Sequence, residues 1–278
     1  MPRLVPFPLA LPALLALALG APALGALAAC RPDRPAGGAD ARRVVQQARA
    51  AHGVDALEGA TLAFTFRETP FALRAGRRFA YTRTRTDSAG RRIEETVDRA
   101  GAHRRVEGRA VPLTPDEQTR LTVAIGSVAY FALLPAPLAD PAVRVRSLGP
   151  DTLRGQPYAR VEVRFAEDGG GADWQDRYVY WIHATRHTVD YLAYTYAVAP
   201  GADGPHDTGT RFREAFGARD VGGFRVQNYR NYTAPRGTPL EAHARLFEAG
   251  ALAPVSEVRL EDARLVRGAA PPEPPPRR

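Results

Sequence analysis

The two-residue period of the apolar side chains constrains the fold of this chain more than any other feature. From Thr61 onward, Leu62, Phe64 and Phe66 alternate with Ala63, Thr65 and Arg67. Similar segments, separated by short turns, follow at 79–85, 91–97, 143–148, 158–165, 177–183, 189–198, 211–216, 224–232 and 255–266. Such alternation is typical of antiparallel strands with one apolar and one hydrated face. We therefore expect about ten strands.

Three helices are predicted between these strands. The first begins with Asp40 as its cap and ends at Gly53, and the second begins with the capping box at 114–117 and runs to Pro135. A second sequence of capping-box type, at 238–241, predicts a third helix that ends at Gly250. The absence of regular βαβ alternation excludes a doubly wound parallel sheet. The predicted fold class is α+β, mainly β with helices: a large curled antiparallel sheet (a half-barrel) wrapped around two or three helices.

The N-terminus has the layout of an export signal. Arg3 precedes an apolar stretch from Leu4 to Ala29 that carries no charge. The stretch is long enough to span a bilayer, but its four prolines favour cleavage over a continuous anchoring helix. It ends in Leu-Ala-Ala-Cys at 27–30, which resembles a bacterial lipobox. That resemblance implies lipidation of Cys30, the only cysteine of the chain, and the alternative is a chance cysteine after a signal peptide.

This interpretation divides the chain into four segments. We expect a lipoprotein signal peptide at 1–29, the acylated cysteine and a tether at 30–39, a single half-barrel-like domain at 40–267, and a disordered Pro-rich tail at 268–278. The predicted partners are the membrane, reached through the lipid on Cys30, and the lipoprotein processing and sorting machinery. Arg31 is not the aspartate that retains such proteins at the inner membrane. In a two-membrane cell this predicts an outer-membrane anchor that faces the periplasm.

The chain contains no lysine, so all 38 of its basic residues are arginine. This excludes Schiff-base aldolases, enzymes that use pyridoxal phosphate and P-loop nucleotidases, because each class needs a lysine amine. The net charge of +8 is scattered along the sequence. Scattered charges are typical of solvated strand faces, although a surface near anionic lipid headgroups is also compatible with them. No nucleic-acid-binding module is recognisable. We therefore predict no nucleic-acid partner.

The segments 153–158 and 178–182, in this order of helices and hairpins, resemble the carrier fold of the outer-membrane lipoprotein localisation system (LolA-like). Motifs at 169–176, 178–181, 190–194 and 211–215 more specifically resemble an uncharacterised family of bacterial envelope lipoproteins. The resemblance covers residues 42–266. It implies a half-barrel sheet whose concave apolar side, with helices as a lid, holds acyl chains. Because a lipid on Cys30 would anchor this chain, a stationary receptor fits it better than a diffusing carrier.

Tyrosines at strand spacing are the predicted ligand-binding residues. Tyr178 and Tyr180 lie on one face of their strand, Val179 and Trp181 lie on the other, and Tyr191 and Tyr194 follow on the next strand. Their rings can line a cavity and offer hydroxyl groups to a bound molecule, although cross-strand packing alone would also favour them. A polar strip that includes Arg211, Arg213, Glu214, Arg225 and Arg230 suits an anion or, more simply, a salt-bridge ladder.

Metal sites are the weaker alternative. The acidic Gly-rich loop at 167–176 carries Asp168, Asp173 and Asp176, whose oxygens suit Ca²⁺, but its spacing is not that of an EF-hand. His183 and His187 with Asp190 suit zinc, or simply a surface turn. No arrangement typical of Ser-His-Asp or Cys-His catalysis is recognisable, so no catalytic residue is predicted. A cofactor is likewise not expected, apart from the calcium alternative.

The sequence therefore predicts a membrane-anchored, non-enzymatic envelope lipoprotein that binds an apolar ligand, a lipid or an acylated partner, in its concave sheet. Two alternatives stay open. One is an envelope hydrolase or metal-dependent enzyme that uses the acidic Gly-rich loop, and the other is a structural envelope protein whose concavity is filled by its own side chains.

Overall fold

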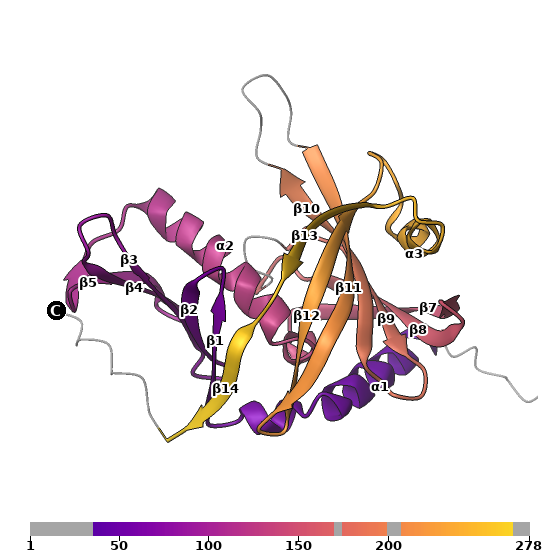
Figure 1. The fold of residues 1–278 in the computed structure, drawn as a ribbon. Helices are drawn as coiled ribbons and strands as arrows, with labels where there is room; N and C mark the ends of the chain where they lie inside the picture. Colours follow the sequence, from indigo (N-terminus) through magenta and orange to yellow (C-terminus); the bar gives the residue numbers. More distant parts are fainter. Residues whose placement is uncertain (1–35, 170–173, 199–206, 269–278) are drawn as a thin grey trace, which may run out of the picture. The chain divides into compact units, whose positions relative to one another are not determined.

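The computed structural model describes residues 36–169, 174–198 and 207–268 (Figure 1). Within these residues the chain forms two seven-stranded antiparallel sheets and three α-helices. The first sheet has the order β14-β1-β2-β3-β4-β5-β6. Its strands are β1 (Ala60–Phe66), β2 (Thr69–Arg74), β3 (Ala80–Thr86), β4 (Arg92–Asp98), β5 (Gly101–Val106), β6 (Arg109–Val111) and β14 (Glu261–Arg267).

The second sheet has the order β13-β12-β11-β10-β9-β8-β7. Its strands are β7 (Val143–Leu153), β8 (Gln156–Phe165), β9 (Tyr178–His183), β10 (Val189–Val198), β11 (Asp207–Val221), β12 (Phe224–Thr233) and β13 (Ala253–Val258). The helices are α1 (Ala36–Ala51), α2 (Pro115–Ala132) and α3 (His243–Glu248), with short 3₁₀ turns η1 (Val54–Leu57), η2 (Ala136–Ala139) and η3 (Leu240–Ala242). The predicted α+β class with a curled, half-barrel-like antiparallel scaffold is confirmed.

The C-terminal segment joins the two sheets. The predicted last strand, 255–266, is in fact two consecutive strands: β13 pairs with β12 of the second sheet, and β14 pairs with β1 of the first. At the crossing, Leu260 is buried and its backbone N–H donates to Oδ1 of Asn228 at 3.0 Å. In Figure 1 the yellow β14 lies beside the indigo β1. The strands therefore divide into two sheets instead of one, but the chain runs directly from the edge of one sheet to the edge of the other.

Helix α2 packs against both sheets. Thr114 caps it as predicted: the backbone N–H of Glu117 donates to Oγ1 of Thr114 at 3.3 Å, and the backbone N–H of Thr114 donates to the Glu117 carboxylate at 3.0 Å. Leu121 and Ile125 on the helix join the core of the first sheet, whereas Phe131 packs on the core of the second. Figure 1 shows α2 between β3–β5 and the second sheet. Because α2 packs against two sheets, more than one side of the helix is apolar.

The other helices cover opposite faces of the second sheet. Helix α1 buries Ala41, Val45 and Ala48 in the cluster that contains Val161 and Ile182. Helix α3 buries its own apolar residues against the face that carries Trp181 and Phe212. The second predicted capping box is wrong. The hydroxyl of Thr238 donates to the carbonyl of Pro235 instead, and the carboxylate of Glu241 pairs with Arg177, so the α-helix begins only at His243.

Helix α1 ends where three segments meet. It begins at Ala36, before the expected cap Asp40, and the chain after it turns at Gly53, whose φ is 64°. The buried ring of His52 accepts a hydrogen bond at Nε2 from the backbone N–H of Val189 at 3.0 Å, and its carbonyl accepts one from the N–H of Arg225 at 2.8 Å. The end of α1 is thereby fixed to β10 and β12.

All described elements belong to one compact unit, residues 35–278, and the four hydrophobic clusters draw on this unit alone. This segment therefore carries a complete core of its own. Among the described residues, none of the helices has the length and apolarity needed to cross a bilayer. The predicted signal peptide and Cys30 lie outside the described residues.

We expect Gly53→Ala to destabilise the protein far more than Gly59→Ala. Both glycines have a φ near 65°, but a Cβ at Gly53 would lie 1.8 Å from the carbonyl oxygen of Gly223, whereas none of the described atoms lies within 4 Å of a Cβ at Gly59. The control should lose about 1 kcal/mol to backbone strain alone, and Gly53→Ala about 3 kcal/mol or more. Urea unfolding measures both, and equal losses would contradict the close contact.

We also expect His52 to make the fold sensitive to acid. Burial, and next the charge of Arg225, lower the pKa of His52 from 6.5 to about 4. The unfolded chain then binds a proton that the folded chain does not, so stability is complete above pH 6.5 and falls as the pH drops toward 4. The largest loss is about 3 kcal/mol. The urea midpoint of the wild type should therefore decrease as the pH is lowered from 6.5 to 4. A His52→Gln variant whose midpoint depends on pH in the same way would refute this account.

Candidate ligand-binding site

A cavity of about 380 Å³ lies where α2 meets the second sheet and the β13–β14 crossing. This volume is in the range of small-molecule sites, roughly 300–1,000 Å³. The lining is mostly apolar and aromatic, and its residues are Phe66, Arg67, Val123, Ser127, Val128, Phe131, Ala132, Asp176, Tyr178, Tyr194, Tyr196, Arg213, Tyr229, Asn231, Val258 and Leu260. The walls thus come from both sheets and from the helix between them.

Helix geometry explains the wall that α2 contributes. Val123, Ser127 and Phe131 are spaced by four residues and therefore follow one side of the helix. Ser127 is exposed, whereas Phe131 is partly buried against the core of the second sheet. The helix is held by its contacts with the first sheet, so this side stays directed at the cavity.

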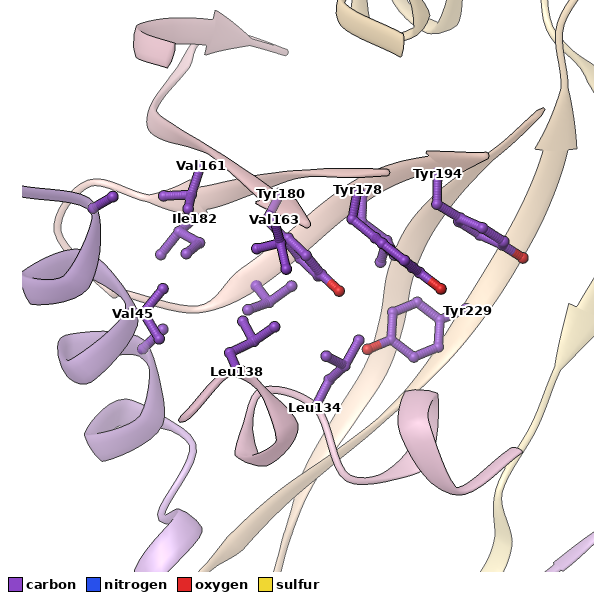
Figure 2. Packing of buried hydrophobic residues seen from close by; sticks show 14 residues of the cluster. Val45, Leu134, Leu138, Val161, Val163, Tyr178, Tyr180, Ile182, Tyr194 and Tyr229 are labelled. Carbon is purple, nitrogen blue, oxygen red and sulfur yellow. The ribbon is translucent and has the colours of Figure 1, made fainter. Parts of the chain in front are cut away.

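Three tyrosines stack in a row on β9 and β10 (Figure 2). The ring centroids of Tyr178 and Tyr180 are 6.0 Å apart, and those of Tyr178 and Tyr194 are 5.3 Å apart, with nearly parallel planes. Figure 2 shows their hydroxyl groups pointing the same way along the row. The hydroxyls of Tyr130 and Tyr180 are 2.6 Å apart. Burial raises the pKa of Tyr180 well above its ordinary value and that of Tyr229 to about 12. The row therefore presents hydroxyl groups and aromatic faces.

Arg213 brings a positive charge into this aromatic wall. Its side chain is buried, and its guanidinium carbon lies 3.5 Å from the ring centroid of Phe131 and 5.3 Å from that of Tyr194. Nη2 donates to the hydroxyl of Tyr194 at 3.0 Å. Nε is buried and has no hydrogen-bond partner among the described residues. Such a group suits a ligand that carries acceptor atoms.

The structure separates the predicted tyrosine and tryptophan set. Tyr178 and Tyr194 line the cavity, and Tyr180 lies next to them in the core. Trp181 and Tyr191 lie on the opposite face of the sheet, where they pack beneath α3. Nε1 of Trp181 donates to Asp151 at 2.8 Å there. Two of the five candidates, Tyr178 and Tyr194, therefore contact the cavity directly. The alternation along β9 explains why Tyr178 and Trp181 lie on opposite faces.

The residues proposed for metals do not converge within the described part of the chain. Asp168 is exposed and Asp176 lines the cavity, while Asp173 lies outside the described residues. The described residues contain no group of three or more acidic, histidine or cysteine side chains arranged to hold a metal ion. Nδ1 of His183 accepts hydrogen bonds from the N–H groups of the turn that follows, at 3.2 Å. Calcium at the acidic loop stays a prediction.

Arginines gather around buried carboxylates on the strand faces. Glu162 accepts hydrogen bonds from Arg146 at 3.0 Å, from Arg164 at 3.1 Å and from Arg177 at 2.7 Å. Burial opposes ionisation, but these three donors outweigh it and lower the pKa of Glu162 to about 2. Glu95 is surrounded in the same way by arginines of the first sheet. In these two clusters the arginines neutralise buried carboxylates within the sheets.

The predicted polar strip divides between the two faces of β11. Glu214 forms ion pairs with Arg154 at 2.7 Å and with Arg230 at 3.2 Å, as expected of a salt-bridge ladder. Arg213 points to the other face and has no ion pair with a carboxylate among the described residues. The sequence pattern placed Arg213 in a strip that suits an anion or, more simply, a salt-bridge ladder, and it gave no signal that Arg213 lines a cavity.

The fold and the cavity define an α+β protein in which a curled antiparallel scaffold and a helix enclose a ligand-sized space. The chain belongs to the family described as "Family of unknown function (DUF6503)", which matches residues 112–260. These residues include α2 and all of the second sheet, and so nearly the whole cavity lining. No curated protein matches the sequence at a significant level.

Several solved structures match this chain. A LolA superfamily protein from Nitrosomonas europaea matches 83% of this chain and 94% of its own, with a TM-score of 0.44 and 7% identity. A DUF1329 family protein from Desulfovibrio piger matches 83% and 95%, with a TM-score of 0.42 and 9% identity. Lipoprotein LppX from Mycobacterium tuberculosis matches 56% and 88%, with a TM-score of 0.24 and 12% identity. The matches include the LolA-like group that the sequence resembles.

We expect Tyr130→Phe to destabilise the protein by about 1–3 kcal/mol, because it leaves the fully buried hydroxyl of Tyr180 without its partner 2.6 Å away. Replacing both tyrosines by phenylalanine should recover part of this loss, since no unpaired hydroxyl then remains. Urea unfolding of the two single variants and the double variant forms the cycle. Additive losses would show that the two hydroxyls do not interact.

Proposed function

We propose that this protein is a lipoprotein of the cell envelope, anchored by a lipid on Cys30, that binds an apolar or amphipathic guest without transforming it. The observation that carries the proposal is the cavity of about 380 Å³ between α2 and the second sheet. Aromatic and aliphatic side chains make up most of its lining, which favours a guest with an apolar body. A free lipid or the acyl chain of a partner has this chemistry.

The construction of the walls supports binding over catalysis. Burying apolar ligand surface contributes about 25 cal/mol per Å², so a hydrocarbon chain along α2 would supply most of the affinity. The tyrosine row is fixed by stacking and by the Tyr130–Tyr180 contact, which favours a preformed site. A site on rigid strands under a helix suits retention of a guest.

The lipobox-like sequence at 27–30 supports the proposed location of the protein in the cell envelope. A lipid anchor keeps the binding domain at a membrane, and Arg31 after the cysteine favours the outer membrane in a two-membrane cell. A stationary receptor that takes its guest from that membrane or from a passing carrier fits this arrangement. Its proposed partners are the lipid itself or an acylated protein.

Native mass spectrometry of residues 31–278 tests the proposal. We expect a guest to remain bound in about equimolar amount, or added single-chain lipids to bind with that stoichiometry. Ser127→Trp should abolish this binding, because the indole would occupy the cavity from an exposed position on α2. Ala124→Trp, on an exposed position of the same helix that does not line the cavity, should leave binding intact. A wild-type protein that binds neither native nor added lipid would overturn the proposed function.

A further inference from the structure

We propose that Arg213 holds the anionic head of the guest, so that the cavity takes a single-chain amphiphile with a carboxylate or phosphate head. The inference rests on the proposed function and gives it a ligand class. It starts from a buried guanidinium that forms no ion pair with a carboxylate of the described residues. Arg213 is only 9% exposed, and it lines the cavity from the middle of β11.

A buried guanidinium is costly unless it is paired with a negative charge or fully hydrogen-bonded. The other buried ionic clusters of this chain obey that rule: Glu162 has three arginine partners and Glu214 has two. Arg213 has no such ion pair among the described residues. Its neighbours are the faces of Phe131, Tyr194 and Tyr229, with one hydrogen bond to the Tyr194 hydroxyl. Aromatic faces stabilise a cation, but they do not neutralise it.

Asn231 makes the place around Arg213 a polar subsite. The two residues lie directly opposite each other on β11 and β12, and both line the cavity. Asn231 is only 7% exposed; its Nδ2 donates to Ser256 at 2.9 Å, and its Oδ1 has no partner among the described residues. Two facing residues therefore each keep one buried polar atom unsatisfied at the same wall. Native proteins rarely leave such atoms without a partner: Nε of Arg213 is a donor that an anionic head can satisfy, whereas Oδ1 of Asn231 needs a donor from the ligand or from water.

The other charges of the lining are compatible with an anion at this place. Arg67 lies at an exposed position over the ring of Phe66, and Asp176 contributes the single carboxylate among the lining residues. Two arginines against one aspartate give the lining a formal charge of +1. The guanidinium fork matches the paired oxygens of a carboxylate or a phosphate.

Cavity size limits the rest of the ligand. A volume of about 380 Å³ is at the small end for ligand sites, which favours one hydrocarbon chain over the several chains of a phospholipid. With the head at Arg213, the chain would follow the apolar part of the lining, formed by Val128 on α2 and by Val258 and Leu260 at the sheet crossing.

Competition binding on residues 31–278 tests the inference with three probes of equal chain length: tetradecanoate, tetradecyl phosphate and tetradecan-1-ol. At about pH 8 the carboxylate and the phosphate are ionised, whereas the alcohol is neutral. We expect the wild type to bind one or both anions roughly tenfold to hundredfold more tightly than the alcohol, as a charge-assisted contact provides. The tighter anion identifies the head, carboxylate or phosphate.

Arg213→Gln should remove this preference while leaving the affinity for tetradecan-1-ol nearly unchanged. Arg211→Gln is the matched control: it removes an arginine from the same face of the same strand, but Arg211 lies over Tyr196 and does not line the cavity. Thermal unfolding of both variants reports whether they fold.

The outcomes separate the two proposals. Wild-type protein that binds all three probes equally, or Arg213→Gln that keeps the preference for anions, overturns the role of Arg213 and leaves the cavity function standing. Wild-type protein that binds none of the probes or native lipids overturns the proposed function itself. Because the wild-type comparison needs no variant, the inference stays testable even if Arg213→Gln does not fold.

Discussion

Helix α2 packs its apolar side chains against two sheets at once, and the arrangement of the binding region depends on this double contact. Leu121 and Ile125 fasten its first half to the first sheet, and Phe131 brings its end onto the second. Since one rigid element touches both sheets, it fixes their separation where the cavity opens. Side chains fill the core on either side of the helix, whereas the space beside Ser127 and Val128 is left open.

Much of the fold was predictable because alternation and capping are local properties. The capping box at Thr114 indicated α2 correctly, since both of its hydrogen bonds lie within four residues. The same pattern at Thr238 failed, because a residue distant in the sequence binds one of its side chains. Arg177, which directly precedes β9, forms an ion pair with the carboxylate of Glu241. The split of the last strand was also unpredictable. Residues 255–267 contain no glycine or proline that would mark a turn, and only their pairing with β12 and β1 divides them.

The binding region followed from the sequence only in part. Alternation places Tyr178 and Trp181 on opposite faces of β9, but it cannot say which face borders a cavity. Trp181 belongs to the face that α3 covers; the sequence indicated a third helix, but not the face of the sheet against which it packs. The position of Arg213 in the cavity wall could not be predicted for a different reason. Arg213 precedes Glu214 on the same strand, and neighbouring residues of a strand point to opposite faces. Glu214 therefore belongs to the salt-bridge ladder, whereas Arg213 lies in the aromatic wall.

The pairing of β1 with β14 has a consequence for how the chain folds. Ala60 lies opposite Arg267, so the edge of the first sheet is completed by residues about 200 positions later in the sequence. During synthesis both β1 and β12 stay open along one side until residues 253–267 have emerged, and open strand edges are templates for aggregation. Residues 253–267 thus complete an edge of both sheets. The contacts of the fold therefore join residues far apart in the sequence, and both sheets are completed late. This favours a folding route in which the nascent chain is shielded until its C-terminal residues have been synthesised.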